Sequence, residues 1–250
     1  AGHFADWAFW YSKTGAFISS TYYGEKLPDW ATQFNSEKHY LKYVTKGWDL
    51  LKPKETYNES LTDNNPYEGK LYKKPPFMPY NLQDMYDAND AGVLRSTTFG
   101  NNLLADFAKK AIESENLGKD NITDFLAVSF SSTDYIGHVL GPRSIELQDT
   151  YLRLDETIAD FLAYLDKTVG KGNYLVFLTA DHAGAENVTY LKDNKYKVDN
   201  INYKNIQKEL KEFSETTFGE NLVLDYSNYN LFFDKAKVKA KGLNLQEVKQ

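Results

Sequence analysis

Two short apolar runs in the second half of the chain are typical of buried β-strands. One covers 124–130 and the other covers 173–179, and both are rich in Phe, Leu and Val. Between them, apolar residues recur at alternating spacings of four and three over 147–165, which predicts a helix with a buried face about five turns long. A strand, a helix and a strand in this order favour two parallel strands joined by a right-handed crossover. We therefore expect an α/β fold built around a parallel sheet.

The pattern is different before residue 98. Residues 6–23 predict a β-hairpin, and a short helix is expected to begin near Pro28, with Trp30 and Phe34 on one face. Residues 45–92 hold five of the seven prolines and show little periodicity. We expect them to form a long surface excursion over the core, of the kind that serves as a lid or an insertion.

Regular patterns return after residue 98. An apolar stripe over 103–112 predicts a helix. Beyond residue 182, a charged amphipathic helix over 203–217 is followed by two short strands, 221–226 and 229–234, and by a last short helix near Asn244. We expect four segments in all: a β-hairpin edge of the core (1–24), an irregular insertion or cap (25–97), the α/β core (98–182) and a small α+β portion (183–250).

Composition narrows the class of protein. With 42% hydrophobic and 26% charged residues, the chain resembles a globular protein that can bury a sizeable core. The formal net charge of −6 argues against a nucleic-acid partner. The sequence contains no apolar run of about eighteen residues, so it predicts no membrane span. The sequence has no cysteine, which excludes disulfides and thiolate metal ligands.

A carboxylate–imidazole pair follows each of the two predicted strands. Asp134 and His138 come just after the first strand, and Asp181 and His182 end the second. Because the carboxyl ends of parallel strands meet at one edge of a sheet, we expect both pairs to lie there. Asp134 and His138 can share one face of a helical turn or converge from a tight loop. Carboxylates and imidazoles without thiolates suit zinc, manganese or iron, and two such ions about 4 Å apart can clamp the oxygens of a phosphoryl transfer.

Each of these residues also has a structural interpretation. Asp-x-x-x-His spacings often form ion pairs on helix surfaces, and an isolated Asp-His pair carries little information. The joint placement of both pairs at two strand ends favours a metal site. His3 and His39 lie in aromatic-rich segments and are expected to be structural. Arg143 is either a partner for an anion at the same edge or a surface cation at a helix start.

At these motifs the chain resembles the alkaline phosphatase superfamily, in particular its bacterial zinc alkaline phosphatases and its nucleotide pyrophosphatase/phosphodiesterases. The resemblance rests on 131–142 and 177–182, with supporting similarity in 1–23 and 149–155, and it extends over nearly the whole chain. It implies a three-layer α/β/α sandwich around a largely parallel sheet. It also implies hydrolysis of small phosphate esters through a covalent phospho-enzyme.

The resemblance further implies two zinc ions. Asp134 and His138 would hold one Zn²⁺, and Asp181 and His182 would hold the other. Other groups that the family uses have no match in this chain: an amino-terminal Asp ligand, the Thr or Ser nucleophile, the Lys and Arg that bind phosphate, and a carboxyl-terminal His ligand. We therefore expect an internal fragment of a larger periplasmic or secreted phosphatase, with weak or absent zinc binding and no turnover by itself. A sheet that lacks strands would expose an edge and invite self-association.

Three other functions stay open alongside a phosphomonoesterase. The nearest is a phosphodiesterase or nucleotide pyrophosphatase of the same superfamily, because the groups that would separate the two activities have no match here. The second is a non-catalytic binding module in which 45–92 contacts a partner or a glycan. The third is an α/β domain whose Asp and His side chains only hydrogen-bond to each other.

Overall fold

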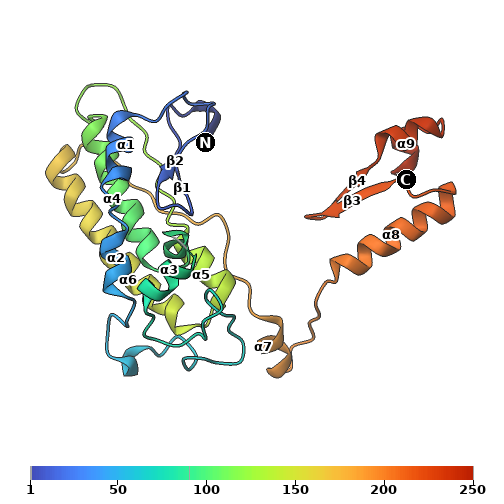
Figure 1. Ribbon diagram of the computed structural model, residues 1–250, viewed down its shortest axis with the longest axis horizontal. Helices are drawn as coiled ribbons and strands as arrows, with labels where there is room; N and C mark the ends of the chain where they lie inside the picture. Colours follow the sequence, from blue (N-terminus) through green and yellow to red (C-terminus); the bar gives the residue numbers. More distant parts are fainter. Residues whose placement is uncertain (1, 90, 250) are drawn as a thin grey trace. The chain divides into compact units, whose positions relative to one another are not determined.

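The computed structural model describes residues 2–89 and 91–249. Three residues of the predicted segments lie outside this description: Ala1, Asp90 and Gln250. The chain divides into two compact units, Ala1–Tyr190 and Leu191–Gln250, which follow one another along the colour scale of Figure 1. Both candidate Asp–His pairs and the predicted insertion belong to the first unit.

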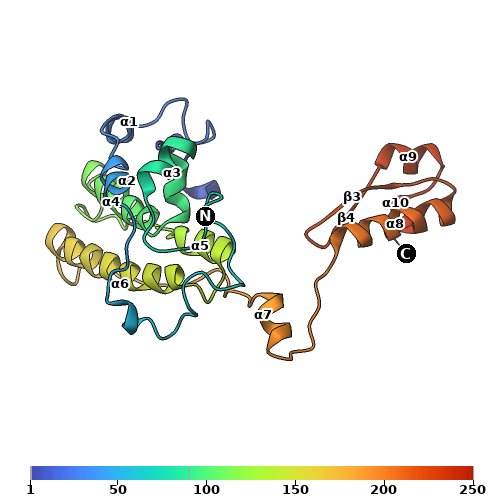
Figure 2. The same cartoon turned by 60° about the horizontal axis from the view of Figure 1, so that its bottom comes forward.

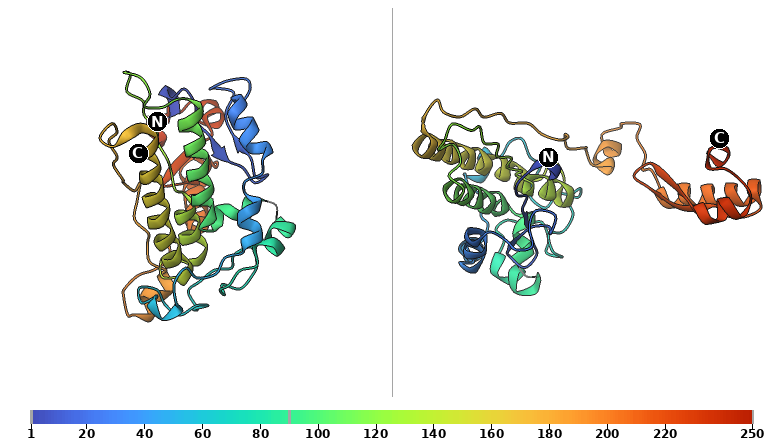
Figure 3. Two further views of the ribbon diagram at one scale, coloured as in Figure 1. Left: turned by 90° about the vertical axis from the view of Figure 1, so that its left-hand side faces the viewer. Right: turned by 90° about the horizontal axis from the view of Figure 1, so that it is seen from above.

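The first unit is mainly helical. Its helices are, in chain order, η1 (Gly2–Phe4), α1 (Asp29–Ser36), α2 (Leu41–Lys46), η2 (Lys54–Thr56), α3 (Leu82–Asn89), η3 (Ala91–Ser96), α4 (Phe99–Ser114), α5 (Ser132–Leu140), α6 (Ile145–Leu165) and the π-helical turn η4 (Asp166–Gly170). A further helix, α7 (Val188–Asp193), crosses the boundary between the two units. α4 and α6 run side by side (Figure 3, left), and α5 packs against both, near one end of α6 (Figure 2).

A short β-hairpin precedes these helices, within the range predicted for it. β1 (Trp10–Tyr11) pairs antiparallel with β2 (Phe17–Ile18). Gly15 lies in the turn with φ +88°, and a Cβ at this position would lie 2.5 Å from the ring of Tyr40. Only glycine combines this backbone conformation with so close a neighbour.

Aromatic side chains from distant segments form the core of this unit. The ring of Phe107 on α4 stacks on that of Phe17 with 3.8 Å between centroids, and it meets Phe34 of α1 edge-on at 5.1 Å. Trp30, also on α1, contacts Phe107 as well. The prediction that Trp30 and Phe34 share one face of a helix is therefore confirmed. Aromatic pairs in such geometries contribute about 0.5–1.5 kcal/mol each beyond their burial.

The segment 45–92, predicted to pass over the surface, is irregular up to residue 81 and is anchored in the core at single positions. Trp48 and Tyr80 are only 0% and 5% exposed, and α3 occupies the end of the segment. The Trp48 indole N–H donates to Asp149 at 2.8 Å, and the Tyr80 hydroxyl donates to Glu146 at 2.6 Å, both on α6. Single anchors at irregular spacing produce no periodicity in the sequence. The segment therefore contributes buried side chains to the core, while much of its backbone follows the surface as its loop-like pattern predicts.

The two predicted parallel strands are extended but unpaired. Among the described residues, neither 124–130 nor 173–179 belongs to a sheet, and Figure 1 draws both as coil. Their apolar side chains are exposed: Phe125 to 75%, Leu175 to 90% and Phe177 to 72%. A strand needs a neighbour for its backbone hydrogen bonds, and no described segment pairs with these two. The expected parallel sheet is thus absent from the described part of the chain.

The helix predicted between these segments is present, but its buried face differs from the predicted one. α6 begins after Ser144, whose hydroxyl accepts a hydrogen bond from the Leu147 N–H. Leu147 and Leu165 of the predicted stripe are buried, whereas Tyr151 of the same stripe is 58% exposed. The buried surface of α6 also includes the polar Asp149. The stripe is incompletely covered because the sheet expected to cover it is not formed by the described residues.

The second unit contains the helix and the two strands predicted between 203 and 234. Its elements are α8 (Tyr203–Phe218), β3 (Val223–Ser227), β4 (Asn230–Phe233), α9 (Lys235–Ala240) and α10 (Leu245–Val248). β3 and β4 pair antiparallel, and a small core gathers around Leu222 and Val238. The side chains of Asn202 and Asp234 cap α8 and α9. α9 is not among the predicted elements, because its alternating lysines show no apolar stripe.

Candidate metal centre

Asp134 and His138 lie on one face of α5. A helix brings residues four apart together, and Asp134 Oδ1 lies 3.3 Å from His138 Nε2. Of the two arrangements that the sequence left open for this pair, the helical one is present. Ile136 and Leu140 on the other face are 0% and 1% exposed. Burial of this apolar face holds α5 in place, while its Asp–His face points outward.

Asp181 and His182 lie in the extended segment that follows η4. The His182 backbone N–H donates to Asp181 Oδ1 at 3.1 Å. Nε2 of His182 lies 3.6 Å from Asp134 Oδ1 and 3.7 Å from Asp181 Oδ2. The structure therefore brings the two Asp–His pairs together, through the contact between His182 and Asp134.

The ring of His182 is oriented by the neighbouring backbone. Its Nδ1 lies 3.1 Å from Ala183 O, a distance at which a protonated Nδ1 donates to the carbonyl. This carbonyl, and then the carboxylates of Asp181 and Asp134, raise the pKa of His182 above its usual value. The raised pKa favours a second proton on Nε2, which faces the carboxylates of Asp134 and Asp181. A metal ion bound at this position would replace that proton on Nε2 while Nδ1 keeps its contact with Ala183 O.

The donor atoms of these residues fit an ion of the zinc type. Zinc binds nitrogen and oxygen at about 2.0–2.2 Å in tetrahedral geometry, which places neighbouring ligand atoms about 3.4 Å apart. The contacts of Asp134 with His138 and with His182, at 3.3 and 3.6 Å, are close to this separation. Across the described ranges, no three or more His, Cys, Asp or Glu side chains already surround a common ion position. The four side chains thus form an exposed cluster of carboxylates and imidazoles.

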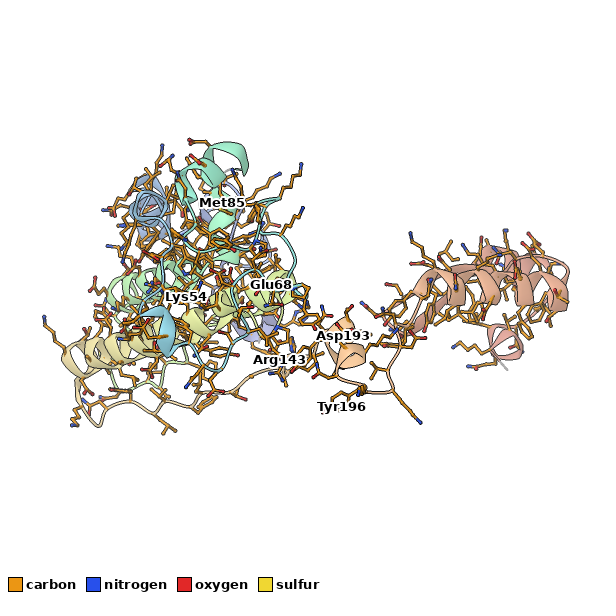
Figure 4. The ribbon with its side chains drawn as sticks, turned by 90° about the horizontal axis from the view of Figure 1, so that it is seen from below. Lys54, Glu68, Met85, Arg143, Asp193 and Tyr196 are labelled. Atoms are coloured by element: carbon orange, nitrogen blue, oxygen red, sulfur yellow. The ribbon has the colours of Figure 1, made fainter. Side chains whose placement is uncertain are left out.

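Arg143 is engaged by a carboxylate. Its guanidinium pairs with Glu186 at 2.8 Å, and its Cζ lies 4.6 Å from the ring centre of Tyr190. Figure 4 shows Arg143 beside the segment that leads into α7. The pair ties the residues after His182 to the start of α6. Arg143 is thus a partly exposed cation at a helix start, one of the two roles that the sequence suggested, and a carboxylate of the chain itself is its partner. Nothing in the sequence signals the pairing, because Arg143 and Glu186 are 43 residues apart.

The other two histidines have structural contacts, in agreement with their interpretation from sequence. His39 Nε2 lies 2.6 Å from a Glu37 carboxylate oxygen, and its ring centre lies 4.3 Å from that of Phe34. The His3 ring meets Tyr22 edge-on at 5.8 Å. These contacts account for both side chains without a ligand.

A second group of acidic side chains is enclosed in the first unit. Glu146 is fully buried, and the nearby Glu68 accepts a hydrogen bond from Asn65 Nδ2 at 2.6 Å. One carboxyl oxygen of Glu68 and one of Glu146 have no hydrogen-bond partner. Burial, and then the charge of Glu146, raise the pKa of Glu68 to about 8. Lys54, labelled with Glu68 in Figure 4, pairs with Asp63 at 3.2 Å.

The sequence is similar to phosphatases of known name. Residues 1–237 match the family described as type I phosphodiesterase / nucleotide pyrophosphatase. Alkaline phosphatase PafA of Elizabethkingia meningoseptica is 44% identical over 253 residues, and alkaline phosphatase PhoV of Synechococcus elongatus is 44% identical over 252 residues. A Myroides odoratus protein named calcium-transporting ATPase is 46% identical over 253 residues. The matches cover 99–100% of this chain but 45–46% of each relative, so the chain spans about half the length of the curated relatives it matches.

The fold is similar to that of the same phosphatase. The crystal structure of wild-type alkaline phosphatase PafA matches with a TM-score of 0.88 and 43% identity, over 96% of this chain and 46% of that chain. A mutant of PafA matches with the same score. The described residues therefore have the fold of part of an alkaline phosphatase. None of the helices in 2–89 and 91–249 combines the length and apolar character needed to cross a membrane.

Proposed function

The chain belongs to the type I phosphodiesterase / nucleotide pyrophosphatase family, and we propose that it forms part of a zinc-dependent phosphate-ester hydrolase of the alkaline phosphatase type. The observation that carries the proposal is the convergence of Asp134, His138 and His182 at contacts of 3.3 and 3.6 Å. Two relatives named as alkaline phosphatases, each 44% identical, support hydrolysis of small phosphate monoesters. A phosphodiesterase is the second candidate, and the description of the matching family favours it.

The four candidate residues would hold two zinc ions. Asp134 and His138 would hold one Zn²⁺, and Asp181 and His182 the other. The 3.6 Å contact between His182 and Asp134 supports adjoining sites, since paired ions in phosphoryl-transfer enzymes lie about 3.5–4 Å apart. When bound, such ions supply positive charge to the attacking and leaving oxygens of the phosphoryl group. The chain's own part is to orient the ligands: α5 aligns Asp134 with His138, and Ala183 O fixes the His182 ring.

This ligand set is incomplete for catalysis. A catalytic zinc ion has about three protein ligands, and each proposed pair supplies fewer. We infer that the remaining ligands, the Thr or Ser nucleophile and the groups that bind phosphate come from the part of the relatives' length that this chain does not match. Residues 1–250 alone should therefore bind zinc weakly and show no turnover. Hydrolysis of 4-nitrophenyl phosphate by the purified chain, at a rate that depends on its concentration, would contradict this inference.

The extended segments 124–130 and 173–179 would become parallel neighbours in a three-layer α/β/α sandwich once further strands are supplied. Their position outside any described helix or sheet and their exposed Phe125 and Phe177 support this proposal. Without such strands, unpaired backbone groups and apolar side chains promote self-association. Light scattering should detect oligomers of residues 1–250 as concentration rises, and a monomer at every concentration would count against the missing strands.

A periplasmic or secreted location is proposed from the alkaline phosphatase relatives alone. In the organism that makes the protein, osmotic shock should release the phosphatase with the periplasmic fraction, or the medium should contain it. Recovery only with cytoplasmic markers would contradict the proposal.

The hydrolase proposal is tested in a chimera in which residues 1–250 replace the matching segment of PafA. It should hydrolyse 4-nitrophenyl phosphate, and Asp134→Ala and His182→Ala should each lower kcat/KM by more than about 100-fold, because loss of a ligand exceeds the effect of losing its supporting contacts. His39→Ala is the matched control, since His39 pairs with Glu37, and it should retain activity. A folded chimera whose kcat/KM is unchanged by the Asp134 and His182 substitutions would refute the proposed site.

The two activities are separated in the full-length protein that contains residues 1–250, because the chimera takes its phosphate-binding groups from PafA. The rate of that protein on 4-nitrophenyl phosphate should exceed its rate on bis(4-nitrophenyl) phosphate. A reversed preference would favour the phosphodiesterase. If neither ester is hydrolysed and chelation of zinc leaves the chimera unchanged, the chain is better described as a binding module.

A further inference from the structure

Arg95 differs from the other two arginines of the chain. Arg143 and Arg153 each form an ion pair, with Glu186 and Asp149. Among the described residues, Arg95 has no carboxylate within ion-pair distance; its contact is with an aromatic ring, that of Tyr135. In a chain with net charge −6, an arginine without a carboxylate partner is a cation available to an anionic ligand.

The backbone of Arg95 is held rigidly. Arg95 belongs to η3, in which every other residue is buried. η3 also packs against the first turn of α5: a Cβ on Gly100 would clash with Ser132 Oγ and would lie 2.6 Å from Leu94 O. The position of Arg95 relative to α5 is therefore determined by core packing, and little backbone order is lost when its side chain binds a ligand.

Tyr135 places this guanidinium beside the candidate metal centre. Tyr135 directly follows Asp134 and precedes His138 by one turn of α5, so its ring lies on the adjoining face of the helix at about 100° per residue. Arg95 Cζ lies 5.9 Å from the centre of this ring, within the range of a cation–π contact. The ring is 43% exposed. Arg95 and Tyr135 thus form a cationic, solvent-accessible border next to the residue pair that would hold one zinc ion.

We propose that Arg95, held over Tyr135, is a specificity-determining residue that receives a second oxyanion on the alcohol portion of the phosphate ester. The planar guanidinium fork matches both carboxylate and phosphate groups, which it binds through two parallel hydrogen bonds. The inference rests on the proposed function, because it needs the phosphoryl group to be bound at Asp134 and His138. An ester with a second anion is then held at both ends, whereas a simple ester is held at one.

The test compares three esters in the PafA chimera that carries residues 1–250: phenyl phosphate, 4-carboxyphenyl phosphate and 1,4-phenylene bisphosphate. Arg95→Ala should lower kcat/KM for one or both doubly anionic esters by about 10-fold, as expected for one exposed charge-assisted contact, and should leave phenyl phosphate nearly unchanged. The two doubly anionic esters distinguish a carboxylate from a phosphate as the preferred group. Arg95→Lys should retain only part of the preference, because the fork is lost.

Lys46→Ala is the matched control. Lys46 Nζ also lies over an aromatic ring, that of Phe99, at 5.7 Å, but it belongs to α2 and not to the border of α5. The Lys46→Ala variant should leave all three rates unchanged. An equal loss of kcat/KM on all three esters in Arg95→Ala would assign Arg95 a structural role and overturn the proposal. No loss on any of the three esters would also overturn it.

A binding measurement keeps the inference separate from the hydrolase proposal. In the zinc-loaded chimera, calorimetry should give 4-phosphonobenzoate a Kd about 10-fold lower than that of phenylphosphonate, and Arg95→Ala should remove this difference. If the chimera does not hydrolyse phenyl phosphate but this Arg95-dependent difference is present, the proposed function fails and the role of Arg95 in binding stands. If phenyl phosphate is hydrolysed but the two phosphonates bind equally, the proposed function stands and the inference about Arg95 fails.

Discussion

Replacing Asp149 with alanine tests how the segment 45–92 is held against α6. Asp149 is fully buried. Its carboxylate accepts four hydrogen bonds, from Trp48 Nε1 at 2.8 Å, Leu51 N at 2.7 Å, the Tyr57 hydroxyl at 2.6 Å and Arg153 Nε at 2.6 Å. In Asp149→Ala all four donors lose this acceptor, three of them from 45–92.

The expected loss follows from what each donor retains. Leaving a buried donor without a partner costs about 1–3 kcal/mol. Arg153 still donates to Asp49 O at 2.6 Å and Leu51 N to the Tyr57 hydroxyl oxygen at 3.1 Å, so the Trp48 indole and the Tyr57 hydroxyl are the donors left without an acceptor. Taking about 2 kcal/mol for each of these two gives about 4 kcal/mol, within the range of about 3–5 kcal/mol for breaking a buried ion pair. That is a large fraction of the free energy of unfolding of a typical domain, which is about 5–15 kcal/mol.

Urea unfolding followed by tryptophan fluorescence measures this loss, since Trp48 is 0% exposed and should report the release of 45–92. Asp149→Asn keeps an acceptor but removes the charge, and should lie between wild type and Asp149→Ala. Asp155→Ala is the control on the exposed side of α6, with an expected change within about 0.5 kcal/mol. A loss below about 1 kcal/mol in Asp149→Ala, or one equal to that of the control, would refute the view that this carboxylate anchors the segment.

Three further changes test separate features. The pKa of Glu68 is raised from 4.5 to about 8, so the folded state binds the extra proton, and stability should fall as pH rises from about 4.5 to about 8 and level off above. The free energy of unfolding should be about 2 kcal/mol larger at pH 6 than at pH 9, after allowance for solvent screening. Glu68→Gln should remove most of this difference. An unchanged difference in that variant would exclude Glu68 as its source. Gly100→Ala should lower the free energy of unfolding in urea by about 1–3 kcal/mol, because the added Cβ would press on Leu94 O. Gly137→Ala should leave this free energy unchanged or raise it, since the nearest atom to its Cβ is 3.8 Å away. Equal effects of the two variants would show that the contact between η3 and α5 tolerates the added methyl group. Ser144→Ala removes the cap of α6 and should lower the thermal midpoint by the equivalent of about 1 kcal/mol, and an unchanged midpoint would mean that the cap contributes nothing.

Local patterns were sufficient to predict the three longest helices and the two small hairpins among the described residues. The stripe over 103–112 lies within α4, the stripe over 203–217 lies within α8, and the strands around 221–234 are β3 and β4. These features have a period of about 3.6 or two residues, so a short window of sequence contains them. The spacing of Asp134 and His138 belongs to the same class, because a single helical turn brings the two side chains together.

Contacts between distant segments are decided by packing. No pattern links Trp48 or Tyr57 to Asp149, which lie 101 and 92 residues apart in the chain, and Arg143 meets Glu186 only because α6 and the segment after His182 adjoin. Apolar runs likewise predict where strands can form but not whether neighbours are present to pair with them, so 124–130 and 173–179 are extended and exposed here. A periodic pattern records one element's own burial, whereas a sheet or a ligand set needs groups from several elements at once. For that physical reason, the four proposed zinc ligands can be recognised from two short stretches of sequence, whereas the 3.6 Å contact that joins His182 to Asp134 is decided only by the tertiary structure.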